Sequence, residues 1–210
     1  MSDAQLPVAF FDIDTQVDFM RPTGRLYVPG AEMIVPNLQE LMRWADANDV
    51  PVISSADAHS PDDPEFKTWP PHCVVGTPGQ QRIPETSFSS PVIIPRRAGA
   101  FHPPMRWVRQ FIVEKTAYDV QDNPNLDAIL HALEMRRFVV FGVATEVCVQ
   151  AAVLALRRRG FAVDVVADAI RPISEEGGRE AVEKMVAAGA RMVTTAEVCK
   201  PRDTTTASLH

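Results

Sequence analysis

The most informative stretch of this chain is Val139-Val140-Phe141-Gly142-Val143-Ala144-Thr145-Glu146-Val147-Cys148. Its apolar first half is typical of a buried strand, its small residues indicate a sharp corner, and a helical pattern follows directly. We therefore expect Cys148 in the first turn of a helix, where backbone N–H groups lack partners and the helix dipole is positive. Such a position lowers the pKa of a thiol and offers donors to an oxyanion. The alternative is an inert buried cysteine, one of the commonest core residues.

Strand patterns and helix patterns alternate on both sides of this stretch. Strands are predicted at residues 8–14, 50–56, 92–94, 111–115, 137–143, 161–166 and 192–194. Helices are predicted at residues 36–48, 145–159 and 174–189, and from an Asn123 cap to about residue 136. The alternation predicts an α/β fold in which a mainly parallel sheet carries helices on both faces. Residues 57–104 are turn-rich and include ten prolines, and loops of such length inside a domain are usually functional.

The composition is that of an ordinary globular domain. The 210 residues are 46% hydrophobic and 23% charged, which predicts one domain over residues 1–200 and a flexible tail at 201–210. A net charge of −6 without a dense basic patch argues against a nucleic-acid partner. No apolar run is long enough to span a membrane, and residues 1–7 do not resemble a secretory signal. Three scattered cysteines fit a reducing compartment, so we expect a cytoplasmic protein, and a homo-oligomer remains possible.

The residues that could carry chemistry fall where predicted strands end. Asp14 ends the first strand, Lys115 ends a middle strand, and Cys148 follows the strand predicted at residues 137–143. Ligands of parallel sheets bind beyond the carboxyl ends of the strands, so these side chains should meet at one edge. A thiol that attacks a carbonyl needs a base for its proton, which Asp14 could provide while Lys115 favours the thiolate by its charge. Taken singly, each residue is more often a solvated strand end, a surface lysine or a core cysteine.

A second group of polar side chains follows the strand predicted at residues 50–56 and indicates a metal site. Carboxylates and imidazoles together suit zinc, iron or manganese. The candidate ligands are Asp57, His59, Glu65 and His72, with Asp62 and Asp63 as rivals to Glu65. The alternative is a polar loop that holds its histidines by chance.

Taken together, these motifs resemble those of the nicotinamidases, within the isochorismatase-like cysteine hydrolase family. The matching stretches are Asp14-Thr15-Gln16-Val17-Asp18-Phe19, Asp57-Ala58-His59, Trp69-Pro70-Pro71-His72-Cys73-Val74-Val75-Gly76-Thr77, Lys115 and Gly142-Val143-Ala144-Thr145-Glu146-Val147-Cys148-Val149. The Trp-Pro-Pro-His-Cys stretch is the most specific, because it separates nicotinamidases from metal-free relatives. The resemblance implies a three-layer α/β/α sandwich with a six-stranded, mainly parallel sheet.

The resemblance also implies a role for each matched residue. Cys148 would be the nucleophile, Asp14 the acid and base, and Lys115 the third member. A cis peptide bond between Val143 and Ala144 would direct the N–H groups of Ala144 and Cys148 toward an oxyanion. A divalent metal, zinc before iron or manganese, would be held by Asp57, His59, Glu65 and His72. The substrate would contact Phe19, Trp69, Gln16 and Val143.

The implied reaction is the hydrolysis of nicotinamide to nicotinate and ammonia through a cysteine thioester. One segment departs from the family pattern. Many members carry a Tyr-Ser-Ala-Phe-like sequence soon after the lysine, whereas this chain has Thr116-Ala117-Tyr118-Asp119-Val120-Gln121-Asp122. Two alternatives therefore stay open: hydrolysis of another small amide, such as a pyrazinamide-like or carbamoyl compound, and a catalytically silent metabolite-binding protein.

Overall fold

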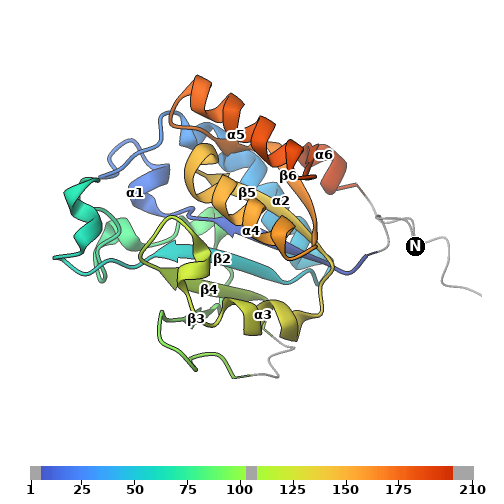
Figure 1. Ribbon diagram of the computed structural model, residues 1–210, viewed down its shortest axis with the longest axis horizontal. Coiled ribbons are helices and arrows are strands. Elements are labelled where there is room, and N and C mark those ends of the chain that lie inside the picture. The colour runs from blue at the N-terminus through green and yellow to red at the C-terminus, as the bar shows by residue number, and fades with distance from the viewer. Residues whose placement is uncertain (1–5, 103–107, 201–210) are drawn as a thin grey trace, which may run out of the picture.

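The centre of the molecule is a seven-stranded parallel sheet, seen in a computed structural model that describes residues 6–102 and 108–200 (Figure 1). The strands are β1 Val8–Ile13, β2 Val52–Asp57, β3 Val92–Ile94, β4 Gln110–Lys115, β5 Arg137–Val143, β6 Ala162–Arg171 and β7 Arg191–Val193. Their order is β3-β4-β2-β1-β5-β6-β7, and all neighbouring strands are parallel. The expected parallel sheet is confirmed. The count of six strands that the resemblance implied is wrong, because the sheet has seven strands, among them the short edge strands β3 and β7, which each pair with a neighbour through three residues.

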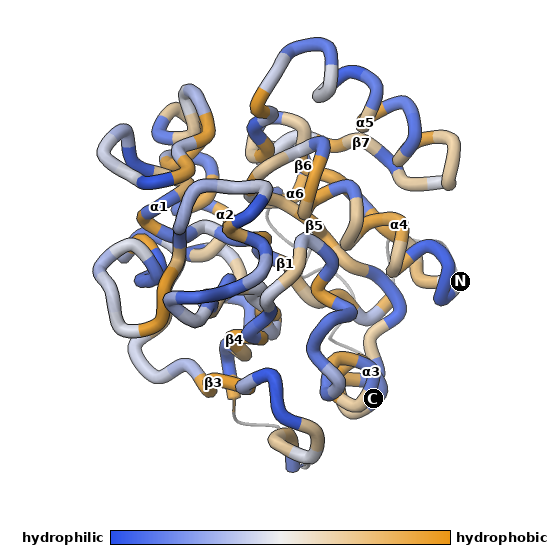
Figure 2. Tube along the Cα trace, turned by 60° about the vertical axis from the view of Figure 1, so that its left-hand side comes forward, coloured by the Kyte–Doolittle hydropathy of each residue, from blue (hydrophilic) through white to orange (hydrophobic). Residues whose placement is uncertain are grey.

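Helices cover both faces of the sheet, as the three-layer prediction requires. They are α1 Val17–Met20, α2 Val35–Ala47, α3 Leu126–Leu133, α4 Gln150–Arg158, α5 Glu175–Ala187 and α6 Thr195–Val198. Short 3₁₀ turns lie at Ala31–Ile34, Pro64–Lys67, Pro78–Gln80, Pro84–Thr86 and Val120–Asp122. One apolar core joins α3, α4 and α5 to the sheet, and the other joins α1, α2 and α6 to its opposite face. In Figure 2 hydrophobic segments lie inside, around β5 and β6, and hydrophilic ones dominate the outer side of α5.

Side-chain periodicity explains the two cores. Successive side chains of a strand point to opposite faces, so Phe10 of β1 enters the core under α2 and Phe11 enters the core under α3 and α4. Helix α2 buries Leu38, Leu41 and Met42, which recur at helical spacing. Because both faces are covered, functional groups can gather only at the ends of the strands.

The helix that carries the cysteine differs from its prediction. A single helix was expected over residues 145–159, but the chain forms a π-helical turn at Thr145–Val149 before α4 begins at Gln150. The N–H group of Val149 donates to the carbonyl of Ala144, five residues earlier, which widens the turn. Such π-turns are frequent at functional sites. Gly160, with φ 82°, ends the helix as predicted.

The helix predicted from an Asn123 cap is shorter than expected. It spans Leu126–Leu133, because the side chain of Asn123 donates to the carbonyls of Ile94 and Glu114 and ties β3 and β4 together. The predicted tail at 201–210 lies outside the described residues, as do residues 1–5 and 103–107. Among the helices that are described, none combines the length and apolar character needed to span a membrane.

Candidate active site

The strand ends bring the predicted reactive residues to one edge of the sheet. Asp14 follows β1 directly, and Asp57 and Lys115 end β2 and β4 as register partners. Cys148 lies in the π-turn that follows β5. Asp14 has a left-handed backbone with φ 49°, a conformation that aspartate tolerates better than most residues. Side chains from four strand connections therefore face one another.

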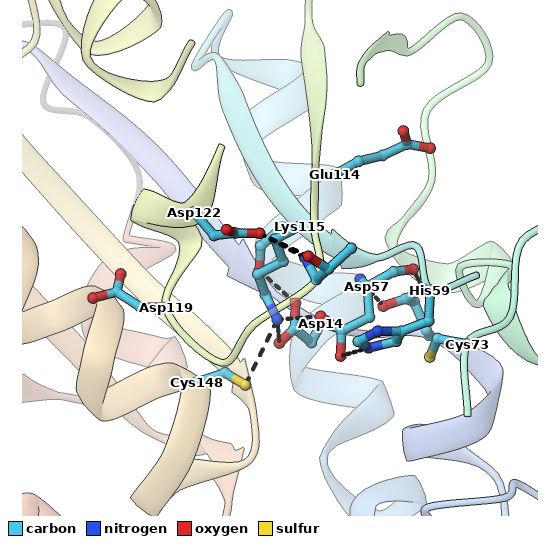
Figure 3. A network of polar contacts seen from close by, with 12 residues as sticks. Asp14, Asp57, His59, Cys73, Glu114, Lys115, Asp119, Asp122 and Cys148 are labelled. Carbon is cyan, nitrogen blue, oxygen red and sulfur yellow. Dashed lines mark hydrogen bonds and ion pairs between the residues drawn. The ribbon is translucent and has the colours of Figure 1, made fainter. Parts of the chain in front are cut away.

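The ammonium group of Lys115 lies at the centre of this arrangement (Figure 3). Its Nζ atom lies 2.9 Å from Oδ2 of Asp14 and donates to Oδ1 of Asp57 and to Sγ of Cys148, the last over 3.8 Å. The contacts with Asp57 and Cys148 are hydrogen bonds, and the contact with Asp14 is an ion pair. Lys115 thus fixes the distance between the thiol and both carboxylates.

Burial and mutual charge set the protonation of this group. Burial alone would lower the pKa of Lys115, but the neighbouring Asp14 and Asp57 carboxylates outweigh it and hold that pKa well above its ordinary value. Burial raises the pKa of Asp14, against the opposing charge of Lys115. Burial also raises the pKa of Cys148 well above the ordinary thiol value, and Lys115 only partly counteracts this. The expected lowering of the thiol pKa is therefore wrong, because desolvation exceeds the help from the helix end and the lysine.

A serine that the sequence reasoning missed holds Asp14. The hydroxyl of Ser55 donates to Oδ1 of Asp14 over 2.6 Å, and both residues are buried. Oδ2 of Asp14 is left to face Lys115. A signal was present in the sequence, because Ser54 and Ser55 are polar residues inside a short strand that is buried along its whole length.

Asp57, His59 and His72 form a buried cluster with the character of a metal site. Oδ2 of Asp57 lies 3.6 Å from Nε2 of His59 and 3.5 Å from Nε2 of His72. Ligands about 2.0–2.1 Å from a tetrahedral zinc lie about 3.4 Å apart, so this spacing fits a shared cation. Burial would raise the pKa of Asp57, but Lys115 and the two histidines lower it strongly, which keeps the carboxylate ionised as a ligand must be.

The two histidines differ in their hydrogen bonding. Nδ1 of His72 lies 2.7 Å from the carbonyl of Pro70, which leaves Nε2 as a free lone pair. His59 is fully buried, and neither of its ring nitrogens makes a hydrogen bond with any residue that the structure describes. A buried histidine without partners is costly unless a ligand satisfies it. The residues present therefore fit a divalent cation.

Glu65 is less closely joined to this cluster. Ligand atoms of Asp57, His59 and His72 lie within 4.8 Å of one another, whereas Glu65 groups in this way with His59 and Asp63. Glu65 nevertheless lines the same pocket as Asp57 and His72. Its predicted ligand role thus needs a movement of its side chain toward those two residues.

A pocket of about 610 Å³, including its open mouth, lies above the reactive group. Asp14 and Cys148 line the end of the pocket that holds the reactive groups. The predicted substrate contacts Phe19, Trp69 and Val143 lie in its walls. Sequence reasoning missed the rest of the apolar wall, which comes from Leu26, Tyr27, Val28, Tyr118, Val147 and Ile173. These residues come from separate segments of the chain, the loop that holds Leu26, Tyr27 and Val28, the π-turn that holds Val147, and the loops of Tyr118 and Ile173, and no local pattern in the sequence connects them.

Gln16, which was predicted to contact substrate, bonds to the backbone of a candidate metal ligand. It is fully buried, and its side chain spans the peptide of Asp57, accepting from the N–H over 2.7 Å and donating to the carbonyl over 2.8 Å. It also donates to the carbonyl of Gln80 over 2.8 Å. Gln16 is not among the residues that line the pocket, and its bonds hold Asp57 in place, so its contact with substrate stays a prediction.

The two residues predicted to stabilise an oxyanion, Ala144 and Cys148, both line the pocket. The peptide bond between Val143 and Ala144 is cis, as the resemblance implied. All three cysteines of the chain are free thiols. A thiol, a carboxyl group and an ammonium thus share one end of an apolar pocket, beside residues that could hold a metal.

Comparison with known proteins gives the family. A family model described as the isochorismatase domain matches residues 8–197. The chain is 26% identical to the nicotinamidase of Escherichia coli (strain K12), over 91% of this chain and 96% of that protein. The pyrazinamidase of Pyrococcus horikoshii in complex with zinc has a TM-score of 0.75 and 28% identity, covering 90% of this chain and 99% of that one. The N-carbamoylsarcosine amidase of Thermoplasma acidophilum has a TM-score of 0.71 and 25% identity, covering 90% and 97%.

The fold and the site together define a hydrolase with a three-layer α/β/α fold, whose reactive groups lie at the carboxyl ends of the strands of a parallel sheet. The chain belongs to the isochorismatase family, since the family model covers nearly all of its described residues.

Proposed function

We propose that this protein is a metal-dependent amidohydrolase that converts nicotinamide to nicotinate and ammonia through a thioester on Cys148. The observation that carries the proposal is the ammonium of Lys115, which links Cys148, Asp14 and Asp57 at one end of a pocket. The E. coli nicotinamidase and the zinc-bound pyrazinamidase of P. horikoshii, both related to this chain, support a small aromatic amide as substrate.

The raised pKa of Cys148 defines the first step of this mechanism. Burial keeps the resting group as a thiol, so attack on the carboxamide carbon requires a proton acceptor. Asp14 is the partner, because its carboxyl group lies against the same Lys115 ammonium as the thiol and lines the same end of the pocket. Asp14 takes the proton as the S–C bond forms and returns it to the leaving nitrogen as the C–N bond breaks. Lys115 remains charged throughout and holds Asp14 and Cys148 together.

The second half of the reaction uses the same groups in reverse. Asp14, again ionised after ammonia has left, takes a proton from water as the water attacks the thioester, and it then returns a proton to Cys148. In both halves the N–H groups of Ala144 and Cys148 would stabilise the developing oxyanion, and losing one such donor costs roughly 10²–10³-fold in rate. A cation held by Asp57, His59, His72 and Glu65 would supply a Lewis-acid contact for the ring nitrogen of the substrate.

An ammonia-release assay on nicotinamide tests this function. The Cys148→Ala variant should lose activity, whereas Cys199→Ala, which alters a free cysteine outside the pocket lining, should keep it. Treatment with a chelator should lower the rate, and added zinc should restore it. A Cys148→Ala protein that releases ammonia at the normal rate would refute the proposal.

A second candidate is hydrolysis of another small amide, such as a pyrazinamide-like or carbamoyl compound. It is favoured by the segment after Lys115, which departs from the family pattern and places Tyr118 in the pocket wall. The structural similarity to an N-carbamoylsarcosine amidase also supports it. Values of kcat/KM on a panel of small amides discriminate the two, because nicotinamide should rank first only under the first proposal. Binding of nicotinamide without turnover of any amide would instead indicate a metabolite-binding protein.

A further inference from the structure

Asp63 contacts two of the candidate metal ligands at once. Its Oδ1 atom accepts the N–H group of Glu65 over 2.9 Å, which caps the 3₁₀ turn Pro64–Lys67. Its Oδ2 atom lies 3.2 Å from Nδ1 of His59. The side chain of Asp63 is only 12% exposed, and that of His59 is fully buried.

The two nitrogens of the His59 ring face different partners. Nε2 faces Oδ2 of Asp57, the oxygen that Nε2 of His72 also faces. A cation shared by these three residues would therefore take the lone pair of His59 at Nε2. Nδ1 would then carry a proton inside the protein, where it needs an acceptor, and Asp63 supplies the nearby carboxylate.

We propose that Asp63 is a positioning residue for the metal site, which orients His59 through Nδ1 and Glu65 through its backbone. This inference rests on the metal dependence in the proposed function. Metal-bound histidines usually donate their second ring N–H to a carboxylate or carbonyl, and in this site His72 uses Pro70 in the same way. Asp63 thereby holds the ring of His59 and the backbone of Glu65 in place before the cation arrives.

The rival reading makes Asp63 itself a ligand, because ligand atoms of His59, Asp63 and Glu65 lie within 4.8 Å of one another. Two contacts argue against it. One oxygen of Asp63 already accepts the N–H of Glu65, and the other lies at the His59 nitrogen that does not face Asp57. A direct ligand would have to give up this second contact.

The test measures the affinity of the metal-free full chain for Zn²⁺, by competition with a chromophoric chelator and without substrate. Asp63→Asn keeps an oxygen for the N–H of Glu65 but removes the carboxylate that faces His59. Its Kd for Zn²⁺ should rise about 10–100-fold, with one ion still bound per chain. Asp62→Asn is the matched control, because it makes the same charge change at an exposed neighbour that belongs to neither group of possible ligands in the described residues, and it should leave the Kd unchanged.

Two further readouts separate positioning from folding and from ligation. The metal-free Tm of Asp63→Asn should match that of the wild type, and the visible spectrum of its Co²⁺ complex should keep the intensity of the wild-type complex. A Kd within twofold of the wild-type value overturns the proposal. The proposal is also overturned if the wild-type chain binds two Zn²⁺ ions and the Asp63→Asn variant binds only one, because Asp63 would then be a ligand. These measurements do not depend on ammonia release. The proposed activity can therefore fail while the role of Asp63 stands, and the role of Asp63 can fail while the proposed activity stands.

Discussion

Replacement of Arg82 by methionine should destabilise the protein strongly, because it leaves a buried carboxylate without its counter-charge. Asp12 lies in the middle strand β1 and is fully buried, and the side chain of Arg82, which pairs with it, is only 5% exposed. Breaking such a buried pair by removing one partner costs about 3–5 kcal/mol. Hydroxyl donors of Thr15 and Ser54, at 3.0 and 3.2 Å, would remain on Asp12, but neither carries a charge.

Equilibrium unfolding in urea and thermal melting measure the effect. For a chain of this size, the expected loss corresponds to a fall in Tm of about 6–20 °C. The double variant Asp12→Asn/Arg82→Met should recover most of the loss, because no charge is then left buried. Arg96→Met is the control, since Arg96 is half exposed where it pairs with Asp122, and such pairs contribute about 0–1 kcal/mol.

The stability lost in Arg82→Met should depend on pH in a defined direction. Burial raises the pKa of Asp12 above its ordinary value of 3.8, and Arg82 opposes the rise. Without Arg82 that pKa rises further, so the folded variant binds a proton at pH values where the unfolded chain does not. The deficit of Arg82→Met should therefore be largest at neutral pH and shrink as the pH falls toward 3.8. A deficit that is independent of pH, or a double variant no more stable than the single one, would refute the reasoning.

Two more substitutions test the site and the corner beside it. Ser55→Ala removes the hydrogen bond to Oδ1 of Asp14, so kcat on nicotinamide should fall about 10–100-fold. The acid limb of the pH profile of kcat should move to higher pH, because burial already raises the pKa of Asp14 and the Ser55 hydroxyl opposes that rise. An unchanged acid limb would contradict this reasoning. Gly142→Ala places a Cβ atom 2.1 Å from the carbonyl oxygen of Ile13 at φ 120°, so the free energy of unfolding should fall by about 2–6 kcal/mol, and wild-type stability in urea would exclude this steric argument.

The strand ends show how far sequence reasoning reached. Asp14, Lys115 and Cys148 were placed at one edge because parallel strands expose their carboxyl ends on the same side, and their contacts agree with that placement. The structural role of Gln16 was not found, because it depends on hydrogen bonds to Asp57 and Gln80, which are distant in the chain and approach Gln16 only after folding. Periodicity describes neighbours along the chain, and it does not describe such contacts.

The amino-acid sequence by itself determined the α/β architecture, the order of its elements and the types of reactive group, because hydrophobic period and residue chemistry are local properties. Only the tertiary structure decided the electrostatic state of the site. The thiol of Cys148 was expected to ionise readily, yet it lies at the end of the pocket beside Asp14 and Asp57, and desolvation there raises its pKa. The pKa of a group depends on the dielectric and charges that surround it in space, and for Cys148 these come from β1, β2 and β4, which are distant in the chain.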